Sequence, residues 1–64
     1  MKDHQRRVVE ELEDLDGKLA RLDGFLADTP SGIALDPAER ADMQQQADTM
    51  STYRRILARR IARF

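Results

Sequence analysis

Apolar side chains recur along the first half of the chain at alternating steps of four and three residues. This spacing puts them on one side of an α-helix and is typical of helices that pack along their length. The positions between them are mostly charged, so the opposite side of the helix is expected to face water. We predict a helix over about residues 2–27, whose packing seam comprises Val8, Leu12, Leu15, Leu19, Leu22 and Leu26.

Proline and glycine interrupt this pattern between about residues 28 and 36, which we predict to be a loop. A second helix is expected directly afterwards, because Asp36 can cap it and Pro37 suits its first position. Its apolar positions again follow helical spacing, although polar side chains lie among them. We predict a helix over about residues 37–63, whose seam comprises Met43, Met50, Leu57 and Ile61.

Two long helices joined by one short loop pack most simply as an antiparallel, coiled-coil-like hairpin. We therefore expect an all-α fold in which residues 1–64 form a single helical-hairpin domain. In this arrangement Val8 is expected opposite Leu57, and Leu12 opposite Tyr53.

The small size of the chain predicts self-association. A domain of 64 residues buries a low fraction of its surface, and an elongated hairpin buries less. Several apolar side chains also lie beside the predicted seam, where one partner helix cannot cover them. We expect a second copy to cover them in a dimeric four-helix bundle or a higher homo-oligomer. These flanking side chains are Val9, Phe25, Ile56 and Phe64.

The composition argues against catalysis and metal binding. Without cysteine the chain has neither a disulfide framework nor a thiolate ligand, and the single histidine, His4, has no carboxylate four residues away. Gly17 and Gly24 lie seven residues apart inside the first helix and cannot form a phosphate loop. They mark either a solvent-exposed side of the helix without a function, or a surface that another backbone or a ligand approaches closely. We expect no enzyme activity, cofactor or metal.

No segment is long and apolar enough to predict a membrane span or a signal peptide. We therefore expect a cytoplasmic protein that does not associate with membranes.

Charge is divided unevenly along the chain. Residues 1–36 carry nine acidic and five basic side chains, whereas residues 37–64 carry three acidic and six basic ones. Part of this asymmetry is expected to cancel across the hairpin, where four carboxylates should lie alongside Arg54 and Arg55. These carboxylates are Glu10, Glu11, Glu13 and Asp14.

A group of cations at the open end of the hairpin has few carboxylates to oppose it. They could bind phosphates or an acidic protein surface, or they could complement the dipole of the second helix. Generic DNA binding is not expected, because no recognition-helix motif accompanies them. These cations are Lys2, Arg6, Arg7, Arg59, Arg60 and Arg63.

A second group of candidate residues lies on the second helix. Gln46, Met50 and Tyr53 follow one another at helical steps, in line with Leu57 and Arg60. They could form the rim of the core, or Tyr53 could stack on a base or another aromatic ring beside the cation of Arg60.

The pattern of these residues resembles a family of very small phage and prophage proteins related to a protein of a crAss-like phage. The resemblance covers about residues 8–61. Gly17 and Gly24 depart from the charged or alanine residues usual there. The residues that carry the resemblance are Glu10-Glu11-Leu12, Lys18-Leu19, Leu22, Phe25-Leu26, Gln46, Met50, Tyr53, Leu57 and Arg60-Ile61.

The resemblance implies a phage-encoded helical hairpin without assigned enzymatic activity, placed in the cytoplasm of the host cell. Small accessory phage proteins often inhibit host defence by stoichiometric binding. The expected function is therefore the binding of a host defence protein or the sequestration of a nucleotide second messenger. The alternative is a structural or assembly adaptor that forms a helical oligomer without a ligand.

Overall fold

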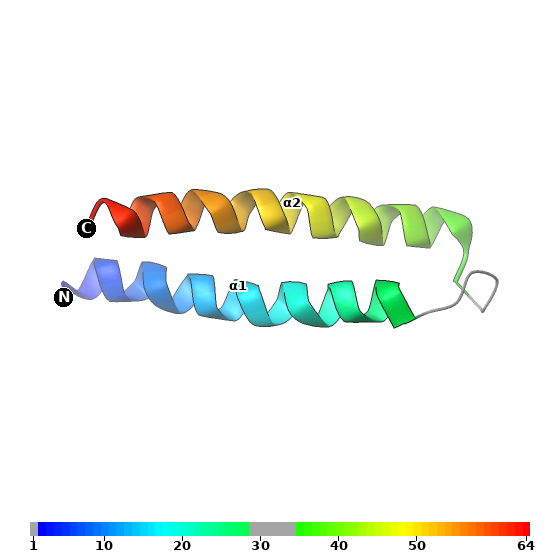
Figure 1. Cartoon of the computed structure of the whole chain (residues 1–64), viewed down its shortest axis with the longest axis horizontal. Coiled ribbons are helices and arrows are strands. Elements are labelled where there is room, and N and C mark those ends of the chain that lie inside the picture. The colour runs from blue at the N-terminus through cyan, green and yellow to red at the C-terminus, as the bar shows by residue number, and fades with distance from the viewer. Residues whose placement is uncertain (1, 29–34) are drawn as a thin grey trace.

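The chain folds into two long antiparallel helices in a computed structural model that describes residues 2–28 and 35–64. Helix α1 spans Asp3–Asp28 and helix α2 spans Pro37–Ala62. Figure 1 shows the helices side by side, with both chain termini at one end of the molecule. The predicted helical hairpin is thus confirmed. Most of the predicted loop, about 28–36, lies outside the described residues.

The first turn of α2 is stabilised by the expected cap. Asp36 lies just before the helix, and its carboxylate oxygen Oδ1 accepts a hydrogen bond from the backbone N–H of Ala38 at 3.4 Å. Pro37 occupies the first helical position, where a backbone N–H would have no partner within the helix. Because a helix cannot satisfy its own first N–H groups, this side-chain acceptor fixes where α2 begins.

The core of the hairpin is small and lies between the two helices. Val8 and Leu15 of α1 and Leu57 of α2 are buried together, and Leu57 is fully inaccessible to solvent. Three half-buried side chains pack against this cluster, and Ala47 is buried separately on α2. The cluster therefore joins helix segments that lie far apart in the sequence. The three packing side chains are Leu12, Met50 and Ile61.

The remaining seam residues are only half-buried. They lie in the half of the hairpin nearer the loop, where no large side chain of residues 2–28 and 35–64 is fully covered. A single helix pair can cover one side of each helix, so these side chains keep part of their surface in contact with water. They are Leu19, Leu22, Leu26 and Met43.

Tyr53 does not lie opposite Leu12 in the core, as the sequence pattern suggested. Its side chain is 41% exposed, whereas Leu12 packs against the buried cluster. The inward positions 43, 47, 50, 57 and 61 of α2 are buried or half-buried, and Arg54 continues this series although its side chain is exposed. Arg54 pairs with Asp16 of α1 and so takes the place expected for Tyr53. Tyr53, one residue earlier, is rotated about 100° away from it.

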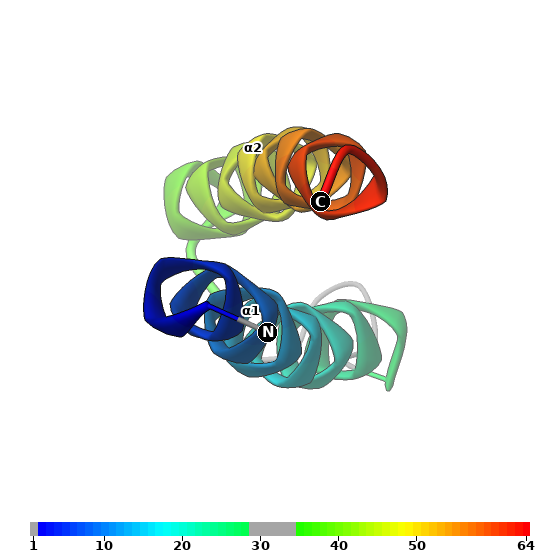
Figure 2. The ribbon, with the colours of Figure 1, turned by 90° about the vertical axis from the view of Figure 1, so that its left-hand side faces the viewer.

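The molecule is a narrow rod, with principal extents of 48 × 14 × 13 Å. The view along the rod shows α1 and α2 tilted relative to one another rather than strictly parallel (Figure 2). In the described part of the chain, neither helix is long and apolar enough to cross a bilayer.

Candidate functional site

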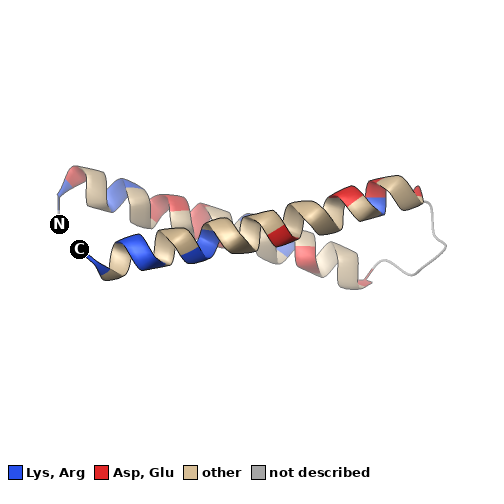
Figure 3. Ribbon diagram, turned by 90° about the horizontal axis from the view of Figure 1, so that it is seen from above, with Lys and Arg blue, Asp and Glu red and all other residues tan. Residues whose placement is uncertain are grey.

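The antiparallel arrangement brings the first turns of α1 and the last turns of α2 together. Six cationic side chains gather there, all of them exposed, and we call this surface the basic end. Figure 3 shows the cationic segments of both helices at the end of the rod where the termini lie. The basic end comprises Lys2, Arg6, Arg7, Arg59, Arg60 and Arg63.

Most of the charge at the basic end is not neutralised within the hairpin. Arg6 pairs with Asp3 at 2.9 Å and approaches Glu10 at 4.0 Å. Within residues 2–28 and 35–64, the guanidinium groups of the four other arginines make neither ion pairs nor hydrogen bonds. They are thus available to a phosphate or a carboxylate, which the planar guanidinium can bind through two parallel hydrogen bonds.

The arginines of α2 also stand where they complement their own helix. Arg59 and Arg60 lie in its last turn, where the helix dipole favours positive charge. The backbone N–H of Arg63 donates to the carbonyl of Arg60 at 3.1 Å, and that of Phe64 donates to Ile61 at 3.0 Å. Since the dipole interaction leaves the guanidinium groups exposed, it is compatible with ligand binding at the same side chains.

The structure separates the second group of candidate residues into two sides. Met50 faces the core and Leu57 is buried in it, whereas Gln46, Tyr53 and Arg60 are exposed. The amide of Gln46 lies 3.9 Å from the sulfur of Met50. Tyr53 and Arg60 are seven residues apart on one side of α2, about 10 Å along the helix. This spacing suits a ligand with an aromatic ring and an anionic group.

The surface of the described residues offers no enclosed binding site. Within residues 2–28 and 35–64 it contains no pocket and no cluster of potential metal ligands, and His4 is exposed. A ligand held by one hairpin would therefore lie against an open surface. Complete enclosure would require a second protein chain.

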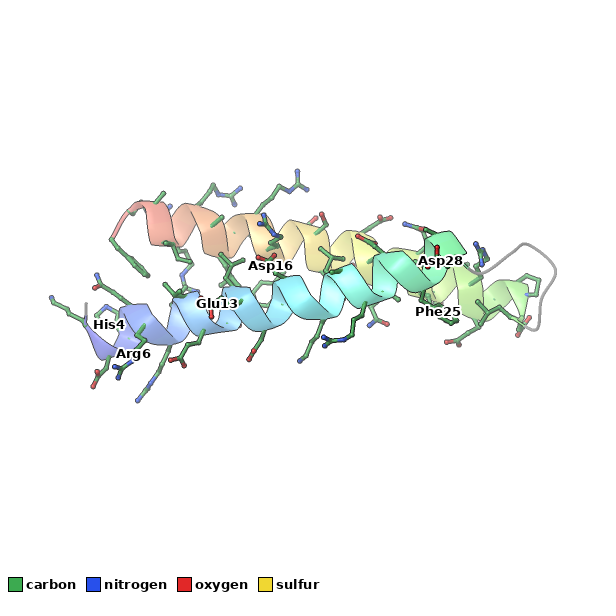
Figure 4. All side chains as sticks on the ribbon, turned by 60° about the horizontal axis from the view of Figure 1, so that its bottom comes forward. His4, Arg6, Glu13, Asp16, Phe25 and Asp28 are labelled. Carbon is green, nitrogen blue, oxygen red and sulfur yellow. The ribbon has the colours of Figure 1, made fainter. Side chains whose placement is uncertain are left out.

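The structure pairs Arg54 with Asp16 of α1 instead of one of the four predicted carboxylates. Figure 4 shows Asp16 on the edge of α1 that faces α2. Arg55 does not reach across the hairpin, because it donates a hydrogen bond to the hydroxyl of Thr52 on its own helix. The sequence feature that could have predicted this ion pair is the position of Arg54, which follows the seam residue Met50 by four residues.

A second contact between the helices was also not foreseen. The guanidinium of Arg40, in the second turn of α2, donates a hydrogen bond to the backbone carbonyl of Leu26 at 3.1 Å. This carbonyl belongs to the last turn of α1, which has no basic residue of its own. Arg40 thus supplies positive charge to the C-terminal end of its neighbour.

The chain matches the model of a known protein family. The model of a family described as Sequestin matches residues 2–63, which is nearly the whole chain. No curated protein and no solved structure matches it.

Proposed function

The chain belongs to the Sequestin family, and we propose that it acts as a sequestering protein, which binds a ligand stoichiometrically and does not transform it. The family description supports binding as the activity but names no ligand. The observation that carries the proposal for this chain is the basic end, where cations from both helices stand exposed. The ligand is accordingly anionic.

Two kinds of anionic ligand suit this surface. A nucleotide second messenger would place its phosphates on the arginines and a base on Tyr53. An acidic patch of a host protein would instead meet the arginines through carboxylates. Both fit a phage or prophage accessory protein that removes a component of host defence in the host cytoplasm, a setting suggested by the sequence resemblance.

The lack of a pocket among the described residues favours an assembly of copies as the binding form. A single hairpin offers a ligand only one side of contact, whereas two or more hairpins can enclose it. The alternative function, an adaptor that forms a helical oligomer without a ligand, is supported by the exposed apolar side chains Phe25, Ile56 and Phe64.

Calorimetric titration with cyclic dinucleotides and trinucleotides tests the nucleotide ligand. The expected result is saturable heat at a fixed ratio of nucleotide to protein, with the nucleotide recovered chemically unchanged after the protein is denatured. Conversion of the nucleotide into a product would contradict sequestration. Absence of heat, together with specific capture of one host protein, would identify the protein ligand.

Paired charge removals test the basic end as the binding surface. Arg7→Ser combined with Arg63→Ser should weaken binding by about a hundredfold, since one charge-assisted hydrogen bond is worth about 1.5–3 kcal/mol. The matched control, Lys18→Ser combined with Arg21→Ser, removes the same charge elsewhere on the rod and should retain near-normal affinity. Equal losses of affinity in both variants would show that binding depends on the net charge of the protein and not on the basic end.

A further inference from the structure

Helix α2 has a second stripe beside the one that packs on α1. Its residues follow one another at steps of four and three, each one residue before an inward position. All six are exposed, and we call them the outer stripe of α2. This spacing is the one that packs helix against helix. The outer stripe comprises Asp42, Gln46, Thr49, Tyr53, Ile56 and Arg60.

The outer stripe lies on the side of the rod away from the ion pair of Asp16 and Arg54. Tyr53 precedes Arg54 by one residue and Ile56 follows it by two, so both point about 100–160° away from Arg54. Phe25 of α1 follows Asp16 by nine residues, which is about half a turn around that helix. Figure 4 shows Phe25 and Asp16 on opposite edges of α1. Three exposed apolar side chains therefore share one side of the rod.

The hairpin has more exposed surface than a compact protein of its mass. Such a protein exposes about 4,200 Å², whereas this one exposes 4904 Å². Its radius of gyration is 14.8 Å, compared with about 10.7 Å expected for a compact chain of this length. The excess is about 700 Å², and a standard protein interface removes roughly 800 Å² from each partner. Association along the rod is therefore one way to bury surface that the elongated hairpin leaves in water.

The charges of the outer stripe are arranged with opposite polarity at its two ends. Asp42 lies near the loop and Arg60 at the basic end, eighteen residues apart, which is about five full turns of helix. Both side chains thus point in the same direction, with Tyr53 and Ile56 between them. The rest of the molecule has the same polarity, because residues 21–42 carry five acidic and two basic side chains.

This pattern is self-complementary only when two copies run in opposite directions. In the reversed arrangement an acidic end meets a basic end twice, while Tyr53 meets Thr49 and Ile56 meets Gln46 in the middle of the stripe. Two copies in the same direction would bring both basic ends together, and like charges would repel. Charge polarity therefore selects a second copy that runs in the opposite direction.

We propose that a second copy of the chain packs on the outer stripe in the reverse direction, so that Asp42 of each copy lies beside Arg60 of the other. The two-fold axis crosses α2 between Thr49 and Tyr53, and Gln46 of one copy lies near Ile56 of the other. The dimer then has a centre of mixed apolar and polar side chains, two charged ends, and the basic ends at opposite extremities. In this dimer Arg60 and Tyr53 belong to the contact between copies, so the ligand is left to the other cations of the basic end.

Sedimentation equilibrium at micromolar concentrations tests the surface. The natural chain should sediment as a dimer, and Ile56→Asp should weaken dimerisation by about tenfold or more, because it places an unpaired charge inside the contact, near Gln46 of the other copy. The matched control is Ser51→Asp, five residues away and about 140° around α2. A monomeric natural chain, or equal dimerisation of both variants, would overturn the proposal.

Charge reversal tests the direction and leaves the middle of the contact unchanged. Arg60→Glu and Asp42→Arg should each weaken dimerisation, since each places like charges side by side in the reversed dimer. The double variant should recover most of the natural association, because the pair is restored with its signs exchanged. If Arg60→Glu alone strengthens dimerisation, or the double variant shows no recovery, the copies do not run in opposite directions.

Discussion

At the scale of single residues, the stability of the hairpin depends most on Leu57. It is the one side chain among the described residues that is large and fully buried, and the clustered residues of α1 contact it from across the interface. Other large apolar side chains keep some contact with water. Loss of side-chain volume at this position leaves a cavity that a two-helix interface cannot easily close.

Leu57→Ala should lower the free energy of unfolding by about 2–5 kcal/mol. In a domain this small, such a loss is a large part of the total stability. Phe64→Ala is the control, because it removes an apolar side chain that is already 47% exposed, and it should cost less than about 1 kcal/mol. Chemical denaturation followed by circular dichroism measures both. Equal losses would contradict the central role of Leu57.

The ion pair of Arg54 and Asp16 contributes less than its position in the seam suggests. Both side chains keep about two fifths of their surface exposed, at 44% and 42%. A double-mutant cycle with Arg54→Ala and Asp16→Ala should give a coupling free energy of only about 0.2–1 kcal/mol, falling in high salt. A coupling well above this range would show that the bridge is shielded from water.

At the scale of elements, the two helices could be predicted from sequence because apolar spacing and cap residues are local signals. The leucine stripe predicted α1, and Asp36-Pro37 predicted the start of α2. The side of α2 that faces α1 was less clear, because two adjacent stripes both contain apolar and polar side chains. Only packing against Val8 and Leu15 decides between them. Because Tyr53 is exposed, its expected pairing with Leu12 is wrong, while its alternative roles at the rim of the core or in stacking stay predictions.

The glycines of α1 weaken that helix without filling a steric need within the hairpin. A Cβ atom at Gly24 would meet nothing within 4 Å, and one at Gly17 would lie 3.5 Å from the end of the flexible Arg21 side chain. Gly17→Ala with Gly24→Ala should therefore raise the free energy of unfolding by about 1–2 kcal/mol. Thermal denaturation checks this value. Destabilisation, or loss of association, would identify a close contact at this face.

The contact between Arg40 and Leu26 joins the ends of the two helices nearest the loop. Arg40→Met keeps most of the aliphatic stem but removes the donor to the Leu26 carbonyl, and should cost about 1 kcal/mol of unfolding free energy. Arg55→Met is the control, because Arg55 bonds only within α2. Similar losses of unfolding free energy from both substitutions would show that the hydrogen bond between the helices contributes no more to stability than one within α2.

At the scale of the whole molecule, the position of the basic end followed from the sequence once an antiparallel hairpin was assumed. Its cations come from the two ends of the chain, and the fold brings those ends together. The outer stripe could not be identified in the same way, because its exposure is known only after the inward side of α2 is fixed. Its mixture of aspartate, glutamine, tyrosine and arginine also gives a weak apolar signal.

The proposed dimer predicts that thermal stability depends on protein concentration. When folding and association are coupled, the melting temperature should rise by about 5 °C for each tenfold increase in concentration. Ile56→Asp should reduce this dependence, whereas Ser51→Asp should leave it unchanged. Melting temperatures measured over three decades of concentration provide the check. A constant melting temperature for the natural chain would contradict coupled association.

The meeting of both termini at the basic end has a practical consequence for anyone who labels this protein. A purification tag, a fluorescent domain or a surface-immobilisation linker fused at either terminus will project from the same cationic surface (Figure 1). An acidic tag there would compete with an anionic ligand, and a histidine tag would add further positive or metal-binding groups. Affinities are therefore best measured on protein from which the tag has been cleaved.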